Sequence, residues 1–306
     1  MHRKTNLVLL NIYMETPRNN KTNQRIYFDL ACQHAPWNKV VKNPGYMFKD
    51  KTYWAYISEN EFNEFKEEMK ADYPNAYNSY KSLELNAGKY PPNMAAFGSS
   101  SRMIYLIARN IKGFTFEQVL PSGDKYGSAH LDGYLSSSNY EIYVEAKCHE
   151  MFSTINNKDI ADCYRELYKK INEKRKERFA FDGVHFMYEG KELKRFDLKQ
   201  VICHFLGIIH KHKNEPKLKE KNIRFIYLTH KLSPAEEDYI NNLNPQLLTG
   251  IKRVLQEENE EMEKIDFSWL FNTLAELQGT TSNSLCNRFE FIHCETEDCF
   301  REKLNI

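Results

Sequence analysis

Three charged residues in the middle of the chain, Asp132, Glu145 and Lys147, have types and spacing that suit metal-dependent chemistry. They lie in the stretch AHLDGYLSSSNYEIYVEAKCHE, residues 129–150, where two segments flank the turn-forming residues SSSN. Successive side chains of a strand point to opposite faces, so Glu145 and Lys147 share one face of the second segment, together with Glu141. We therefore expect a β-hairpin that gathers two acids and a lysine on one side of a sheet.

The expected register of this hairpin sets the separation of the two acids. A turn centred on the serines places Asp132 opposite Tyr143 and diagonal to Glu145, at about 7–8 Å between Cβ atoms. Two carboxylates and a backbone carbonyl, such as that of Ala146, suit Mg²⁺, which prefers oxygen ligands and keeps several waters; Mn²⁺ is a second candidate. The metal would activate a water and neutralise charge on a phosphodiester, while Lys147 would orient the water or stabilise the transition state. Phosphodiester hydrolysis is the reaction that these groups fit best.

The elements that must position these residues alternate between helix and strand. The sequence predicts helices in 58–74, 98–113, 165–179 and 196–213, and strands at 114–120, in the hairpin, at 222–230 and at 288–294. Ser58 is the expected cap of the first helix and Pro74 its end. This order predicts an α/β fold, with a mixed central sheet flanked by helices and with additional helical segments. We divide the chain into an aromatic, Asn- and Lys-rich segment packed on the core (1–95), the core (96–232) and a mostly helical region (233–306).

In this order of elements, Asp132 followed by Glu145-Ala146-Lys147 resembles the PD-(D/E)XK nuclease superfamily, the fold of restriction endonucleases. With Glu150 three residues after Lys147 and the later helix DLKQVICHFLGI, the pattern resembles a bacterial group of restriction endonucleases. The resemblance covers residues 95–232. It implies a restriction-endonuclease-like sheet, Asp132 and Glu145 as metal ligands, Lys147 as the catalytic lysine, DNA as the substrate and a homodimer as a common assembly.

Three residues have uncertain places in this pattern. Many members of the superfamily carry a further acid on the first core helix, but SSSRMIYLIARN contains no carboxylate. Glu84, upstream of that helix, is a candidate replacement, and Gln200 is a candidate for facing the site. Glu150 matches the pattern without an assigned role.

Other interpretations remain open at this stage. Alternating Glu-x-Glu-x-Lys is also typical of an edge strand with a solvated face. A non-catalytic member of the fold, which binds nucleic acid in a defence or repair complex, would retain the same residues. A carboxylate-pair glycosidase is a third class, which Lys147 argues against because glycosidases need no cation beside their acids.

Cysteines and histidines offer a rival metal site. Structural zinc prefers C-x₂₋₄-C or H-x₃₋₅-H spacing, whereas most of these residues are adjacent pairs or irregularly spaced. The candidates are Cys148, His149, Cys203, His204, His210, His212, Cys286, His293, Cys294 and Cys299. Buried or surface thiols are the simpler interpretation.

Charge and composition narrow the class of protein further. The 306 residues carry a formal net charge of +1, but residues 165–178 and 191–224 are strongly basic and residues 256–266 are acidic. A basic middle region is compatible with a phosphate backbone as partner, although such helices are often only solvated. Seven scattered cysteines indicate a reducing, cytoplasmic setting, and no apolar stretch is long enough for a bilayer. We expect MHRKTNLVLLNIYMETPRNN to form an early strand or helix, since a signal-peptide cleavage site is lacking.

Overall fold

The computed structural model describes the chain over residues 20–38, 56–82, 84–86, 92–123, 126–153, 162–174, 178–182, 185–218, 220–280 and 285–304. The strand or helix expected within residues 1–20 falls almost wholly outside these ranges. The chain forms two compact units: the first comprises Met1–Asn110, Lys147–Ser153 and His230–Leu255, and the second comprises Ile111–Ala146, Thr154–Thr229 and Gln256–Ile306. Our division by composition follows the chain, whereas each of these units combines three separate segments.

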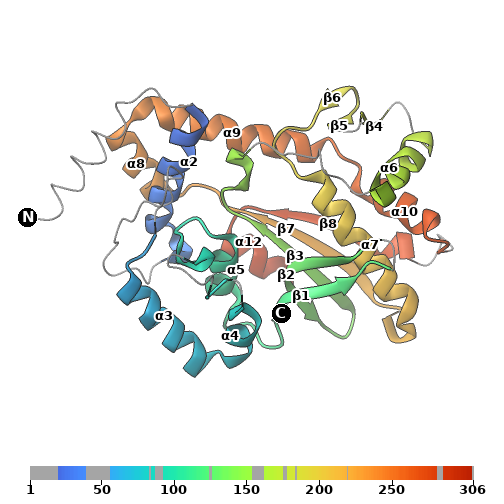
Figure 1. Cartoon of the computed structure of the whole chain (residues 1–306), viewed down its shortest axis with the longest axis horizontal. Coiled ribbons are helices and arrows are strands. Elements are labelled where there is room, and N and C mark those ends of the chain that lie inside the picture. The colour runs from blue at the N-terminus through green and yellow to red at the C-terminus, as the bar shows by residue number, and fades with distance from the viewer. Residues whose placement is uncertain are drawn as a thin grey trace, which may run out of the picture. The chain divides into compact units, whose positions relative to one another are not determined.

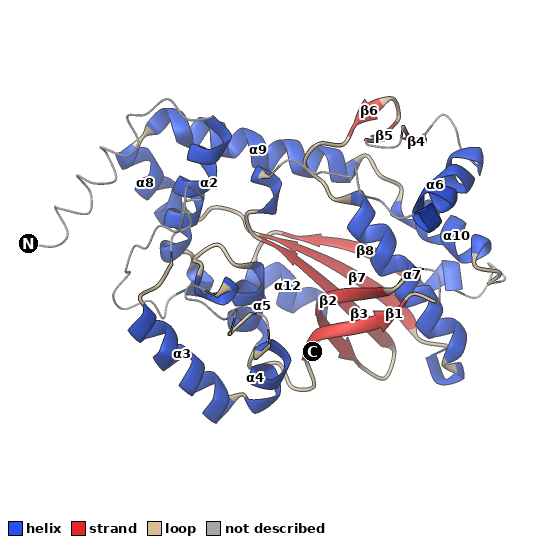
Figure 2. Ribbon diagram, viewed as in Figure 1, coloured by secondary structure: helices blue, strands red, loops and turns tan. Residues whose placement is uncertain are grey.

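The second unit is built on a five-stranded mixed sheet in the order β1-β2-β3-β7-β8 (Figures 1 and 2). The strands are β1 (Thr115–Pro121), β2 (Ser128–Ser136), β3 (Tyr140–Lys147, whose last residue belongs to the first unit), β7 (Asn222–Thr229) and β8 (Phe289–Cys294). β1, β2 and β3 form an antiparallel meander, and β7 and β8 are parallel. The N–H of Asn222 donates to the carbonyl of Asn139 at 2.9 Å, so β3 and β7 begin side by side and run in the same direction. The predicted fold class, a mixed central sheet with flanking helices, is confirmed.

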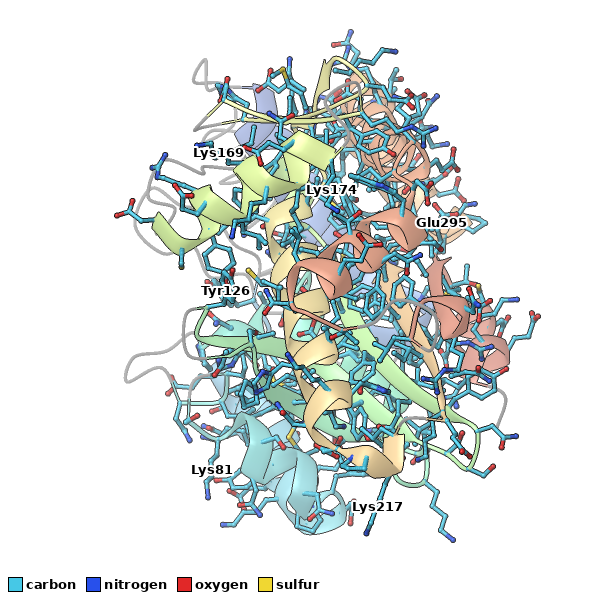
Figure 3. The ribbon with its side chains drawn as sticks, turned by 90° about the vertical axis from the view of Figure 1, so that its right-hand side faces the viewer. Lys81, Tyr126, Lys169, Lys174, Lys217 and Glu295 are labelled. Atoms are coloured by element: carbon cyan, nitrogen blue, oxygen red, sulfur yellow. The ribbon has the colours of Figure 1, made fainter. Side chains whose placement is uncertain are left out.

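Helix α7 covers the face of the sheet that carries Glu141, Tyr143 and Glu145. The helices of this unit are α6 (Asp162–Lys174), α7 (Leu198–Asn214), α10 (Phe267–Leu277) and α12 (Glu297–Leu304). Asp197 caps α7 by accepting the backbone N–H of Gln200 at 3.0 Å. α7 lies very close to β1 and β2, because a Cβ on Gly207 would be 2.9 Å from the Cβ of Leu120. Only a glycine therefore permits the approach, which fixes the height of α7 above the sheet (Figure 3).

An aromatic core fixes α7 laterally as well. Phe205 makes edge-to-face contacts with Phe225 of β7, Phe271 of α10 and Phe289 of β8, with ring centroids 5.0–5.4 Å apart. Such contacts add to the burial of the rings themselves, so the side chains of α7 meet β3 in a defined register. A small second sheet, which the sequence analysis did not predict, consists of β4 (Phe179–Phe181), β5 (Phe186–Tyr188) and β6 (Lys191–Glu192).

The first unit is helical in the part of the chain that the structure describes. Its helices are α2 (Asn20–Ala31), α3 (Glu59–Asp72), α4 (Pro74–Tyr80), α5 (Ser100–Ala108) and α8 (Pro234–Leu243), and α9 (Pro245–Glu263) begins in it. The predicted cap of α3 is confirmed, since Ser58 Oγ accepts the N–H of Glu61 at 3.3 Å. Pro74 follows the end of α3 and starts α4 at the position where its missing N–H costs nothing.

Candidate active site

The hairpin that carries Asp132 and Glu145 forms as predicted, but in a different register. Gly133 pairs with Val144 and Tyr134 with Tyr143, so the expected pairing of Asp132 with Tyr143 is wrong. The observed register differs from the expected one by two residues, and the assigned pairs between β2 and β3 run from Gly133–Val144 to Ser136–Glu141. On β2, both Ala129 and Tyr134 lie toward α7, so the alternation of side chains is interrupted between them, next to Asp132.

β3 is a central strand, which excludes the interpretation of its charges as a solvated edge. β3 lies between β2 and β7, and the side chains of Glu141 and Glu145 are 0% and 2% exposed. A buried carboxylate is costly unless charge partners or hydrogen bonds compensate it. Each of the two acids therefore needs an explanation of its own.

Glu141 has a structural explanation. Lys221 Nζ lies 2.7 Å from Glu141 Oε1, Lys211 Nζ lies 3.3 Å from Oε2, and the hydroxyl groups of Ser136 and Tyr134 donate to the same carboxylate. Burial alone would raise the pKa of Glu141, but these partners outweigh it and lower the pKa below its usual value. The carboxylate ties the hairpin to α7 and to the chain just before β7.

Glu145 faces a histidine instead. His204, on the inner face of α7, places Nε2 at 3.0 Å from Glu145 Oε2, and both side chains are 2% exposed. Phe225 lies beside the imidazole, with ring centroids 6.0 Å apart. The sequence showed His204 only as one member of the adjacent pair Cys203-His204, and nothing in it indicated a contact with Glu145, 59 residues earlier. The one available signal was the position of His204 on the apolar face of its helix, one turn before Gly207.

Asp132 is held at the end of the same hairpin. It is half-buried on β2, and its Oδ2 accepts the backbone N–H of Ala146 at 2.7 Å. This contact fixes the carboxylate beside the segment Glu145–Ala146. The second unit thus brings Asp132, Glu145 and His204 to one region between β2, β3 and α7.

Lys147 is the last residue of β3 and begins the segment that belongs to the first unit. Within that segment, Glu150 Oε2 accepts the N–H groups of Cys148 and His149 at 2.7 and 2.9 Å. Burial tends to raise the pKa of Glu150, but the charges of Lys147 and His149 and the backbone donors lower it overall. The sequence gave Glu150 no role. In the structure its carboxylate is ionised and, through these two hydrogen bonds, stabilises the turn that follows Lys147.

The two other expected contributors are placed as follows. Glu84 belongs to the first unit, where its Oε1 accepts an N–H of Asn93 at 3.2 Å. Gln200 lies on α7, one turn before His204, and is half-buried. The expectation that either residue completes the site stays a prediction.

Three of the rival histidine candidates have hydrogen-bonding roles. His149 Nδ1 lies 2.7 Å from Asp29 Oδ1, and its Nε2 accepts from Arg25 at 2.9 Å. His212 Nε2 lies 3.1 Å from the hydroxyl of Tyr143, and His293 Nε2 lies 2.7 Å from Thr229 Oγ1. The side chain of Cys286 is outside the described part.

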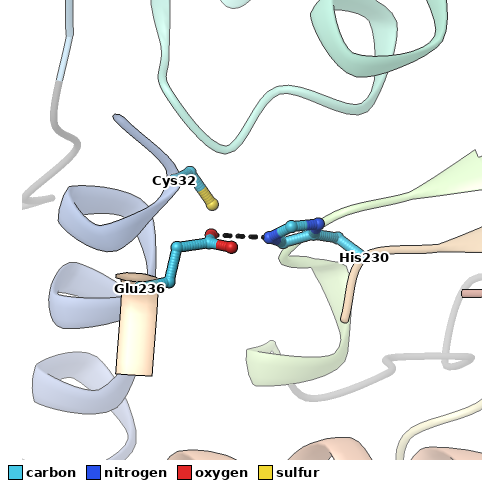
Figure 4. Close-up of side chains that lie close together, drawn as sticks. All are labelled: Cys32, His230 and Glu236. Atoms are coloured by element: carbon cyan, nitrogen blue, oxygen red, sulfur yellow. Dashed lines mark hydrogen bonds and ion pairs between the residues drawn. The ribbon is translucent and has the colours of Figure 1, made fainter. Parts of the chain in front are cut away.

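Within the described residues, one group of three potential ligands gathers closely: Cys32, His230 and Glu236, buried in the first unit, have ligand atoms within 4.8 Å of one another (Figure 4). Trp37 Nε1, which can only donate, lies 3.0 Å from His230 Nδ1, so this nitrogen accepts and Nε2 carries the proton. That proton is donated to Glu236 Oε1 at 2.7 Å. Burial and the neighbouring Cys148 raise the pKa of the Cys32 thiol well above its usual value. In this structure the cluster is therefore held by hydrogen bonds, and a metal would bind there only by displacing the protons of the thiol and the imidazole.

The local charges also pair within the second unit. Glu261 of α9 accepts the backbone N–H groups of Lys194, Arg195 and Phe196 at 2.8–3.0 Å, and Arg195 Nε lies 3.0 Å from Glu257. Of these contacts, the Arg195–Glu257 ion pair joins opposite charges of the basic segment 191–224 and the acidic segment 256–266, whereas Glu261 accepts from backbone groups that carry no charge. Lys174 of α6, labelled in Figure 3, likewise lies 3.4 Å from Glu276.

The comparisons with known proteins return no match, whether with protein-family models, with curated proteins or with solved structures. Across the described ranges, none of the helices combines the length and apolar character that a membrane span requires. The site is therefore interpreted from its own geometry.

Proposed function

We propose that this protein is a Mg²⁺-dependent nuclease that hydrolyses phosphodiester bonds of DNA, in the manner of the restriction-endonuclease-like enzymes that its sequence resembles. The observation that carries the proposal is the burial of Glu145 on a central strand, with Asp132 of the neighbouring strand held beside it at the N–H of Ala146. A buried carboxylate is costly unless it is compensated, and a cation bound by Glu145 and Asp132 would contribute to that compensation.

The donor set fits a hard divalent cation. Asp132 and Glu145 would hold it with carboxylate oxygens, and the carbonyl of Ala146 is a third candidate oxygen, which suits Mg²⁺ with waters in the remaining positions. When bound, the ion would supply an activated water and neutralise charge on the phosphate. Asp132 lies beside Ala146, whose N–H it accepts, and would turn from this contact to bind the ion.

The order of elements supports the same proposal. Helix α5, the meander β1-β2-β3, helix α7 and strand β7, which runs parallel to β3, follow one another in the order that the resemblance implies. By strand alternation Lys147 follows Glu145 on the same face of β3, where an ammonium group would stabilise the charge of the reacting phosphate. The proposal includes DNA as partner, a homodimer as assembly and a cytoplasmic setting. The six cysteines whose side chains the structure describes are free thiols, which agrees with a reducing compartment.

Cleavage of plasmid and of single-stranded DNA tests the proposal. Purified wild-type protein is incubated with Mg²⁺, Mn²⁺ or EDTA, beside Asp132→Asn, Glu145→Gln and the control Glu166→Gln, an exposed acid of α6. We expect cleavage with metal by wild type and control, and a loss of at least about 100-fold in both site variants, because the metal-held transition state is lost.

Two results would contradict the proposal. Cleavage that persists in both site variants would assign the activity to a contaminant or to another site. DNA binding without cleavage by the wild type, under all metal conditions, would favour the non-catalytic member of the fold.

A further inference from the structure

The imidazole of His204 is buried without a hydrogen bond. Its side chain is 2% exposed, and neither Nδ1 nor Nε2 has a hydrogen-bond partner in the part of the chain that the structure describes. Buried polar groups are satisfied in the great majority of cases, and an exception indicates a water, an ion or a catalytic role. His212, another buried histidine of α7, is hydrogen-bonded to Tyr143 through Nε2.

The position of Nε2 relative to Glu145 narrows these choices. The 3.0 Å separation from Oε2 would allow a hydrogen bond, yet the ring nitrogen is not aligned with the oxygen as an N–H···O bond requires. Two ligands that each lie about 2.1 Å from an octahedral metal, at right angles to one another, are separated by about 3.0 Å. In that arrangement the nitrogen lone pair would point at the metal and not at the oxygen, and the observed separation and the missing hydrogen bond agree with it.

We propose that His204 is a third protein ligand of the divalent cation, binding through Nε2 beside Glu145 Oε2. This inference rests on the proposed metal site and adds a nitrogen donor from α7 to the carboxylates of the hairpin. The carboxylate of Asp132 does not lie within 4.8 Å of both Glu145 Oε2 and His204 Nε2. It would therefore complete the site by turning from the N–H of Ala146 toward the ion.

A nitrogen ligand changes which metal the site prefers. Imidazole favours transition-metal ions such as Mn²⁺ over Mg²⁺, for which oxygen ligands are preferred. With His204 bound, the protein would select Mn²⁺ more strongly than a site of carboxylates and a carbonyl. The preference resides in a residue that the sequence motif does not contain.

Electron spin-echo spectroscopy of the Mn²⁺-loaded full-length protein tests the ligand directly, because a coordinated imidazole gives a ¹⁴N modulation. The variants are His204→Ala, His204→Gln and the control His210→Gln, a half-exposed histidine of the same helix. Calorimetric titration with Mn²⁺ and Mg²⁺ supplies affinities, and circular dichroism shows whether each variant is folded. We expect the ¹⁴N modulation in the wild type and in His210→Gln, and not in the two His204 variants. Both His204 variants should lose at least about tenfold in Mn²⁺ affinity and less than that in Mg²⁺ affinity.

The outcomes separate this inference from the proposed function. Mn²⁺ binding that depends on Glu145 but shows no ¹⁴N modulation would overturn the role of His204 and leave the carboxylate site standing. Retention of Mn²⁺ affinity in a folded His204→Gln variant would overturn it as well. DNA cleavage is scored on the same preparations: a modulation without cleavage would support the ligand and contradict the nuclease.

Discussion

His212 should make the protein sensitive to acid, and the size of the effect follows from its surroundings. The imidazole is 1% exposed at the end of α7, and burial lowers its pKa from 6.5 to about 4, while the neighbouring Glu141 acts in the opposite direction and Lys211 adds to the lowering. The unfolded chain takes up a proton near pH 6.5, which the folded protein accepts only near pH 4. The unfolded state therefore binds more protons in this window, and stability falls as the pH is lowered through it.

The expected magnitude is about 3 kcal/mol. A shift from 6.5 to about 4 is 2.5 units, and each unit corresponds to about 1.36 kcal/mol. The free energy of unfolding from urea titrations, followed by circular dichroism between about pH 7.5 and pH 4, gives the dependence for wild type and His212→Gln. The variant should lose about 3 kcal/mol less over this range, because glutamine does not titrate. Other acid-sensitive groups contribute equally to both proteins and cancel in the difference.

A matched control is available on the same helix. His210 is half-exposed and hydrogen-bonds Asn214 through Nε2, so His210→Gln should keep the pH dependence of the wild type. Parallel curves for wild type and His212→Gln would refute the reasoning, since they would show that burial does not hold the imidazole neutral.

Three further predictions concern the elements that carry the site. Glu141→Gln should lower the free energy of unfolding by about 3 kcal/mol in urea titrations at neutral pH, because it leaves two partly buried lysines unpaired; an unchanged midpoint would contradict this. Gly207→Ala should cost about 1–3 kcal/mol by forcing α7 from the sheet, and an increase in the melting temperature would show that the contact is not tight. Mild oxidation should join Cys294 and Cys299, whose Sγ atoms lie 3.0 Å apart, and peptide mass spectrometry without reductant should find the linked pair and no other at comparable yield.

Much of the fold could be predicted because local patterns determine it. The alternation in β3 and the apolar periodicity of α7 place these elements, but the expected register of the hairpin was wrong by two residues. Burial of β3 could not be predicted, because its second neighbour, β7, lies about 75 residues further along the chain.

The surroundings of the acids depend on contacts that no local pattern encodes. His204 meets Glu145 only because the glycine at position 207 lets α7 approach the sheet. The ion pair between Arg195 and Glu257 is likewise a long-range contact that charge counted along the sequence does not reveal.

Lys147 offers the most direct test of the nuclease, since it should act in cleavage without binding the metal. DNA cleavage and Mn²⁺ affinity are measured together for wild type, Lys147→Ala and Glu145→Gln. We predict that Lys147→Ala retains Mn²⁺ affinity within about threefold but loses at least about 100-fold in cleavage rate, whereas Glu145→Gln loses both. Undiminished cleavage by Lys147→Ala, with metal still bound, would contradict the assignment of this strand as the catalytic centre.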